Sequence, residues 1–152
     1  MFAMNPTPVQ LRRLEEAARD AAKHAYAPYS GFTVGAAVLT EHGKIVAGAN
    51  VENASYGLCN CAERTAIFTA ISQGARALRC VVVYTPTKKP TAPCGACRQV
   101  ISEFGPAVRI ISVCDSDARV ETTVADLLPG AFGPHNLAAK PRSVRSARER
   151  RR

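Results

Sequence analysis

Apolar and polar positions follow two periods along the chain, one helical and one strand-like, so both kinds of element are predicted. Helical spacing predicts a first helix over residues 8–26, with Thr7 and Gln10 forming a capping box at its start. Strands are predicted at residues 32–39, 44–51, 80–84 and 109–114. Further helices are predicted at residues 61–73, from Cys94 to near Gly105, and at 124–128, with Pro93 in the first turn of the second. Helices and strands that alternate after an opening hairpin imply an α/β fold with three layers, α/β/α, around a mixed β-sheet core.

Length and charge indicate one domain followed by a basic tail. A chain of 152 residues can bury roughly two-thirds of its unfolded surface in one core. We expect the single domain to span residues 1–139, with no internal repeat. Residues 140–152 contain seven Lys or Arg and one Glu, and therefore carry +6 of the net charge of +8. Such a segment is expected to be disordered and to contact nucleic acid at most weakly and in a salt-dependent way.

The use of cysteine favours metal binding over disulfides. Six cysteines occur in a chain that shows no signal-peptide pattern and no apolar run near the roughly eighteen residues of a membrane span. We therefore expect a reducing, cytoplasmic location and no membrane partner. Cys80 and Cys114 lie in apolar runs and are interpreted as inert core thiols. The histidines at positions 24, 42 and 135 fall in no metal-ligand pattern.

Two short motifs combine soft metal ligands with a carboxylate. Cys61-Ala62-Glu63 stands about thirty residues before a P-C-x-x-C sequence that contains Cys94 and Cys97. Three protein ligands with an open fourth position are typical of catalytic zinc, whereas structural zinc sites have four. Glu63 is then placed to move protons beside the metal, and helix N-termini at Cys61 and Cys94 would favour thiolates. Arg64 and Arg98 are candidates to offset the formal charge of about minus one that three thiolates leave on Zn²⁺.

Two other interpretations of these residues stay open. Asn60 to Glu63 also has the spacing of a capping box, in which Glu63 would only bind the backbone amide of Asn60. Cys59 could join the other three cysteines in a closed structural zinc site, although the C-x-C spacing is tighter than usual.

With these motifs placed, the chain resembles the small, three-cysteine, homotetrameric cytidine deaminases over about residues 11–132. The resemblance rests on five blocks in order, which are FTVGAA (32–37), NVENASY (50–56), CAERTA (61–66), PCGACRQ (93–99) and LLPGAF (127–132). It implies one zinc per chain, held by Cys61, Cys94 and Cys97. It also implies hydrolytic deamination of cytidine and deoxycytidine to uridine and deoxyuridine plus ammonia, in pyrimidine salvage.

The resemblance further implies a role for each binding residue. Asn50 and Glu52 would bind the ribose 3′-hydroxyl, Phe32 would pack against the pyrimidine, and the Ala62 backbone would read the base edge. Glu63 would take a proton from a zinc-activated water, pass it to ring N3, and carry a second proton to the departing amino group. Residues that reach the active site of a neighbouring subunit in a homotetramer with shared active sites would be Ala54, Tyr56 and Phe132.

Without the resemblance, Phe32 and Val34 fit an ordinary alternating strand, and Asn50 and Glu52 fit solvated groups at a strand end. Two rival functions also remain. One is a deaminase of another aminopyrimidine, such as blasticidin S or a base within nucleic acid. The other is a non-catalytic, zinc-stabilised module that binds RNA through the basic tail.

Overall fold

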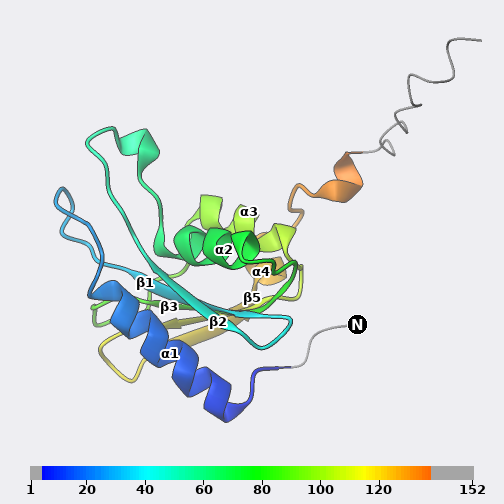
Figure 1. Ribbon diagram of the computed structural model, residues 1–152, viewed down its shortest axis with the longest axis horizontal. Helices are drawn as coiled ribbons and strands as arrows, with labels where there is room; N and C mark the ends of the chain where they lie inside the picture. The colour runs from blue at the N-terminus through cyan, green and yellow to red at the C-terminus, as the bar shows by residue number, and fades with distance from the viewer. Residues whose placement is uncertain (1–4, 138–152) are drawn as a thin grey trace, which may run out of the picture.

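The computed structural model describes residues 5–137 and has a five-stranded mixed sheet at its centre (Figure 1). The strand order is β2-β1-β3-β4-β5. The strands are β1 (Gly35–Thr40), β2 (Ile45–Ala49), β3 (Leu78–Tyr84), β4 (Arg109–Val113) and β5 (Arg119–Thr123). The β3 and β4 strands are parallel, whereas the other neighbouring pairs are antiparallel.

Helices cover both faces of this sheet (Figure 1). The α1 helix (Pro8–Ala22) lies on one face, while α2 (Ala62–Ser72) and α3 (Gly95–Glu103) lie on the other, with the short α4 (Val124–Leu127) beside α3. Single-turn 3₁₀ helices occur at η1 (Tyr56–Leu58) and η2 (Pro134–Asn136). The predicted three-layer α/β/α fold with a mixed sheet is confirmed.

Each face of the sheet has its own apolar core. Because successive side chains of a strand point to opposite faces, a strand covered on both sides must be apolar throughout. In β1, Ala37 and Leu39 pack with α1, whereas Ala36 and Val38 pack with the α2 and α3 side. The continuous apolar runs in the sequence therefore mark the strands that are buried on both faces.

The first helix begins as predicted and ends earlier. The Gln10 amide donates to Thr7 Oγ1 at 3.2 Å, and the Thr7 amide donates to Gln10 Oε1 at 3.0 Å, which confirms the capping box. The helix ends at Ala22, and not at Tyr26, because Tyr26 pairs with the segment that follows β2. The Tyr26 amide donates to the Asn50 carbonyl at 3.0 Å. Tertiary pairing outweighs helix propensity at this position.

The β5 strand was not predicted from the sequence. Its residues, RVETT, form no apolar run because β5 is an edge strand with mostly exposed side chains. The antiparallel backbone ladder with β4 holds it, and ion pairs add to this, since Glu121 bonds Arg109 on β4 and Arg119 bonds Glu15 on α1 at 3.0 Å. Polar pairing of this kind leaves no signal in a hydrophobic pattern.

The expectations for residues 138–152, including the domain boundary at 139/140 and the disordered tail, lie outside the described residues. Between residues 5 and 137, no helix combines the length and apolar character needed to cross a membrane.

Two glycines allow helices to lie directly on strands. A Cβ atom on Gly35 would meet the Ala18 carbonyl oxygen of α1 at 1.9 Å. A Cβ atom on Gly48 would meet the Ala66 amide nitrogen of α2 at 2.5 Å. Both contacts are with backbone, which cannot rotate away as a side chain can. Because α2 packs closely against β2, the N-terminus of α2 lies next to the loops that flank the sheet.

We expect Gly35→Ala to lower the free energy of unfolding by about 3 kcal/mol or more, because overpacking against rigid backbone costs about 1–3 kcal/mol and occasionally more. The measurement is chemical denaturation at fixed protein concentration. Gly57→Ala is the matched control, since a Cβ atom there meets nothing within 4 Å, and we expect a change of about 0.5 kcal/mol or less. Equal stability of the two variants would contradict this packing of α1 on β1.

Candidate metal centre and active site

Three cysteine sulfurs converge where the N-termini of α2 and α3 meet. Cys61 is the N-cap of α2, Cys94 is the N-cap of α3, and Cys97 lies in the first turn of α3. All three sulfurs lie within 4.8 Å of one another, and those of Cys61 and Cys94 are 3.8 Å apart. Tetrahedral zinc with Zn–S bonds of about 2.3 Å requires sulfurs about 3.8 Å apart. The donor set and its spacing therefore fit zinc.

The capping-box interpretation of Asn60 is wrong. Cys61 is the N-cap of α2, and no side chain caps this helix. The Asn60 amide donates to the Val51 carbonyl at 2.9 Å, and its side-chain nitrogen donates to Thr65 Oγ1 at 3.0 Å. Pro93 is also placed differently from the prediction, since it precedes the N-cap of α3 instead of lying in its first turn.

The closed four-cysteine site is not formed. Cys59 faces Asn53, whose amide donates to the Cys59 sulfur at 3.3 Å, and Cys59 is not part of the sulfur cluster. Cys80 and Cys114 are buried away from the cluster, as expected of core thiols. Burial raises the pKa of Cys80 to about 12, so this thiol stays protonated.

The cluster favours a thiolate at Cys61. A hydrogen bond from Cys97, followed by contacts with Arg64 and Cys94, lowers the pKa of Cys61 to about 5. The same hydrogen bond and burial raise the pKa of Cys97. The Arg64 guanidinium lies 3.5 Å from the Cys61 sulfur through Nη2. Metal binds the thiolate form, which this environment supplies.

Of the two arginines that were predicted to balance the charge of the thiolates, Arg64 contacts the cluster and Arg98 binds carbonyl groups instead. Arg64 contacts the sulfur of Cys61, and its buried Nε has no hydrogen-bond partner among the described residues. Arg98 turns to carbonyl groups, donating from Nε to Pro93 at 2.8 Å and from Nη1 to Leu127 at 3.0 Å. Arg98 thus ties the start of α3 to the end of α4.

Glu63 is a buried carboxyl beside this cluster. It is the second residue of α2 and is only 4% exposed. Burial raises the pKa of Glu63, and the neighbouring Cys61 thiolate adds to the effect. A carboxyl group in such surroundings can exchange a proton nearer neutral pH than an exposed one.

Glu63, two cysteines of the cluster and Cys59 line a cavity of about 240 Å³. The predicted site residues in its wall are Phe32, Asn50, Glu52, Cys61, Glu63 and Cys94. Wall residues to which the sequence assigned no metal or substrate role include Ser30, Val34, Asn60, Thr85, Thr91 and Ala92. Asn60 and Ala92 directly precede the blocks that begin at Cys61 and Pro93, which is the signal that could have identified them.

Asn50 and Glu52 hold the segment before β1 against this cavity. The Asn50 side chain accepts from the Val34 amide at 2.7 Å and donates to the Phe32 carbonyl at 2.8 Å. The Glu52 carboxylate accepts from the amides of Tyr29 at 2.9 Å and Ser30 at 3.2 Å. Neither residue is a free solvated group at a strand end.

The remaining predicted residues do not line the cavity of their own chain. Ala62 is fully buried as the first residue of α2, and Ala54 is exposed. Tyr56 is 73% exposed and packs edge-to-face on Tyr29. Phe132 is 59% exposed and borders a separate groove beside α3 and α4.

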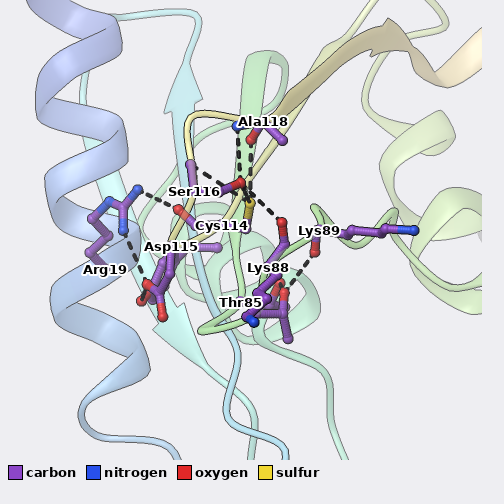
Figure 2. Close-up of polar contacts among 10 residues, drawn as sticks. Arg19, Thr85, Lys88, Lys89, Cys114, Asp115, Ser116 and Ala118 are labelled. Carbon is purple, nitrogen blue, oxygen red and sulfur yellow. Dashed lines mark hydrogen bonds and ion pairs between the residues drawn. The ribbon is translucent and has the colours of Figure 1, made fainter.

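A polar network braces the loop that leads from β3 to α3 (Figure 2). Ser116 Oγ donates to the Lys88 carbonyl at 3.0 Å, and the Asp115 amide donates to the Thr87 carbonyl at 2.9 Å. Arg19 on α1 donates to the Cys114 carbonyl at 2.8 Å. The loop that carries Thr91 and Ala92 into the cavity wall is therefore anchored to the turn after β4.

The sequence is similar to a known family and to curated proteins. The family model described as "Cytidine and deoxycytidylate deaminase zinc-binding region" matches residues 8–114. A cytidine deaminase of Halalkalibacterium halodurans is 51% identical over 114 residues, covering 74% of this chain and 86% of that protein. A cytidine deaminase of Sporosarcina psychrophila is 45% identical over 131 residues, covering 86% of this chain and 96% of that protein.

Solved structures agree with the sequence comparisons. The crystal structure of cytidine deaminase from Burkholderia pseudomallei superposes with a TM-score of 0.77 at 51% identity, covering 80% of this chain and 98% of that one. That of cytidine deaminase from Mycobacterium tuberculosis gives a TM-score of 0.71 at 41% identity, covering 81% and 97%. Together with the three-thiol cluster and its adjacent carboxyl, these matches show that the chain belongs to the cytidine and deoxycytidylate deaminase family.

Proposed function

We propose that this protein is a zinc-dependent hydrolase that deaminates free cytidine and deoxycytidine to uridine and deoxyuridine plus ammonia, in pyrimidine salvage. The observation that carries the proposal is a buried carboxyl, Glu63, beside three thiols with zinc-like spacing in the wall of a nucleoside-sized cavity. A closed structural site, as in the RNA-binding alternative, would need Cys59 as a fourth ligand, and the Cys59 sulfur is not part of the cluster of three.

The proposed metal ligands are Cys61, Cys94 and Cys97, which hold one Zn²⁺ per chain. When bound there, zinc supplies Lewis-acid activation of a water molecule. The Arg64 guanidinium offsets the negative charge of the thiolates by its contact with Cys61. Arg98 holds the start of α3, and thereby Cys94 and Cys97, in place through the Pro93 carbonyl.

Glu63 is the proposed proton carrier. It removes a proton from the attacking water and passes it to ring N3, which makes C4 of the cytosine more electrophilic. It then carries a second proton to the amino group, which leaves as ammonia. Its burial supports this role, because the raised pKa of Glu63 suits a group that must both accept and release a proton. The Ala62 backbone, next to Glu63 at the start of α2, is proposed to read the base edge.

The charges of the cavity wall favour a free nucleoside over a nucleotide or nucleic acid. Among the described residues, the cavity wall contains Glu52 and Glu63 and no Lys or Arg. Phosphate groups would meet like charge at this wall. Phe32 offers a ring to the base, while Glu52 and Asn50 offer acceptors and donors to the ribose 3′-hydroxyl.

We further propose a homotetramer in which subunits share active sites. Exposed large apolar side chains gather on the loops outside the cavity, and clusters of this kind mark protein interfaces. Ala54, Tyr56 and Phe132 would complete the cavity of a neighbouring subunit. The proposed location is the cytoplasm, because none of the six cysteines forms a disulfide, as is usual in a reducing compartment.

Replacement of a proposed ligand should empty the metal site. Cys94→Ala leaves two thiols, so we expect purified protein to lose most of its zinc, measured as metal per chain by elemental analysis. Cys59→Ala is the matched control and should keep one zinc per chain. Full zinc content in Cys94→Ala would remove Cys94 from the ligand set, whereas zinc loss in Cys59→Ala would restore the four-cysteine alternative.

Removal of the Glu63 proton carrier should stop turnover without removing metal. General acid-base catalysis contributes about 10²- to 10⁴-fold, so Glu63→Gln should lose at least about a hundredfold in kcat while retaining zinc. The assay follows ammonia release from cytidine at matched zinc content, with blasticidin S and a cytosine-containing oligonucleotide as competing substrates. A variant as active as the wild type would refute the mechanism, and a preference for either competitor would refute the substrate.

Shared active sites predict complementation between two inactive chains. We expect Phe132→Ala and Glu63→Gln to be impaired separately, and to recover part of the activity when co-refolded into mixed oligomers. Recovery follows because one mixed site can combine an intact Glu63 with an intact Phe132 from the neighbour. The measurement is kcat per zinc for the mixture beside each variant alone; simple averaging of the two activities would argue against residues lent across an interface.

A further inference from the structure

One hydroxyl joins the two residues that the proposed function assigns to the ribose and the base, bonding the side chain of Glu52 and the backbone amide of Phe32. Ser30 Oγ donates to Glu52 Oε1, and the Phe32 amide donates to Ser30 Oγ at 3.0 Å. The Ser30 amide also donates to Glu52 Oε2, at 3.2 Å. Ser30 itself lines the nucleoside cavity together with Glu52 and Phe32. The loop after α1 thus wraps the carboxylate that faces the cavity.

The chemistry of these groups fixes the direction of each hydrogen bond. A carboxylate only accepts, so the single proton of the Ser30 hydroxyl goes to Glu52. A backbone amide only donates, so the Phe32 amide uses a lone pair of the same hydroxyl oxygen. The hydroxyl therefore has one orientation that serves both neighbours. A methyl group in place of the hydroxyl could form neither bond, and a group that only donates could not accept from the Phe32 amide.

The position of the Glu52 carboxylate depends largely on this loop. Within residues 5–137, no Lys or Arg forms an ion pair with Glu52, and its acceptor bonds come from Ser30 and the Tyr29 amide. The bond from the Ser30 hydroxyl is also the main reason why the pKa of Glu52 lies below its ordinary value. The hydroxyl therefore orients the carboxylate.

We propose that Ser30 is a positioning residue for sugar recognition. It orients the Glu52 carboxylate toward the ribose hydroxyl and, by its bond to the Phe32 amide, holds Phe32 where its ring can face the base. This inference rests on the proposed nucleoside deaminase function. Ser30 touches none of the reacting atoms, so it acts through Glu52 and Phe32. Its loss should weaken binding of substrates that carry the 3′-hydroxyl and should leave the chemistry at C4 almost unchanged.

The test compares two substrates that differ at the sugar. For Ser30→Ala we expect kcat/KM for cytidine to fall about tenfold, the effect of one hydrogen bond to a charged group, with most of the change in KM. For 3′-deoxycytidine, which lacks the hydroxyl assigned to Glu52, the fall should be about twofold or less. Ser30→Thr keeps a hydroxyl and should restore cytidine turnover. Zinc content per chain should be unchanged in both variants.

The control variant is Ser72→Ala. In the wild type, the Ser72 hydroxyl donates to the Thr69 carbonyl at the C-terminal end of α2, whereas Glu63 lies at the N-terminal end. Ser72→Ala should match the wild type with both substrates. In a Glu52→Ala background, adding Ser30→Ala should lower kcat/KM for cytidine little further, because the carboxylate that Ser30 orients is already absent.

The outcomes separate this inference from the proposed function. Equal losses for cytidine and 3′-deoxycytidine, a loss confined to kcat, or full activity of Ser30→Ala with cytidine would overturn the role of Ser30 while leaving the deaminase intact. A wild-type protein that turns over neither nucleoside at full zinc occupancy would overturn both.

Discussion

The meeting of two helix N-termini at three thiols is the constraint on which the rest of the structure depends. The α2 and α3 helices follow different strands, yet both must begin within a few ångströms of one point so that Cys61, Cys94 and Cys97 can converge. Their common face of the sheet makes this possible, and Gly48 removes the side chain that would lift α2 from β2. Metal–sulfur bonds tolerate only a few tenths of an ångström of error, so the sheet must hold both helix starts rigidly.

The same meeting point brings together several ionisable groups with a single cation in contact with a sulfur among the described residues. Three thiols and the buried Glu63 lie together, and Arg64 is the cation in contact with a cluster sulfur among the described residues. Arg98, which the sequence placed beside the cluster, binds carbonyl groups instead. A divalent cation at the thiols would stabilise the site in a way that its own side chains do not. The fold thus leaves this centre electrostatically incomplete, which is characteristic of a functional site.

The local parts of this arrangement could be predicted from the sequence, whereas its long-range parts could not. Cys61 and Glu63 lie within one turn, as do Cys94 and Cys97, so their spacing alone indicates a metal site beside a proton carrier. Buried strands are visible as apolar runs, whereas the polar edge strand β5 pairs with β4 through its backbone and forms ion pairs, neither of which a hydrophobic periodicity records. The contact between Ser30 and Glu52 was not predicted because the two residues are 22 positions apart, and their contact depends on how two loops fold together.

The site divides its tasks between two kinds of structure. The groups assigned to the metal and the proton stand at helix starts that are packed on the sheet, where the backbone has little freedom. The groups assigned to the nucleoside stand on the segments around Ser30 and Glu52, which lie outside the five-stranded sheet and are held together by side-chain hydrogen bonds and one isolated backbone bridge. Changes in those segments can alter how the sugar is bound without moving the thiols or Glu63. Because the two parts are held by different interactions, substrate preference can vary in this architecture while the chemistry at C4 stays constant.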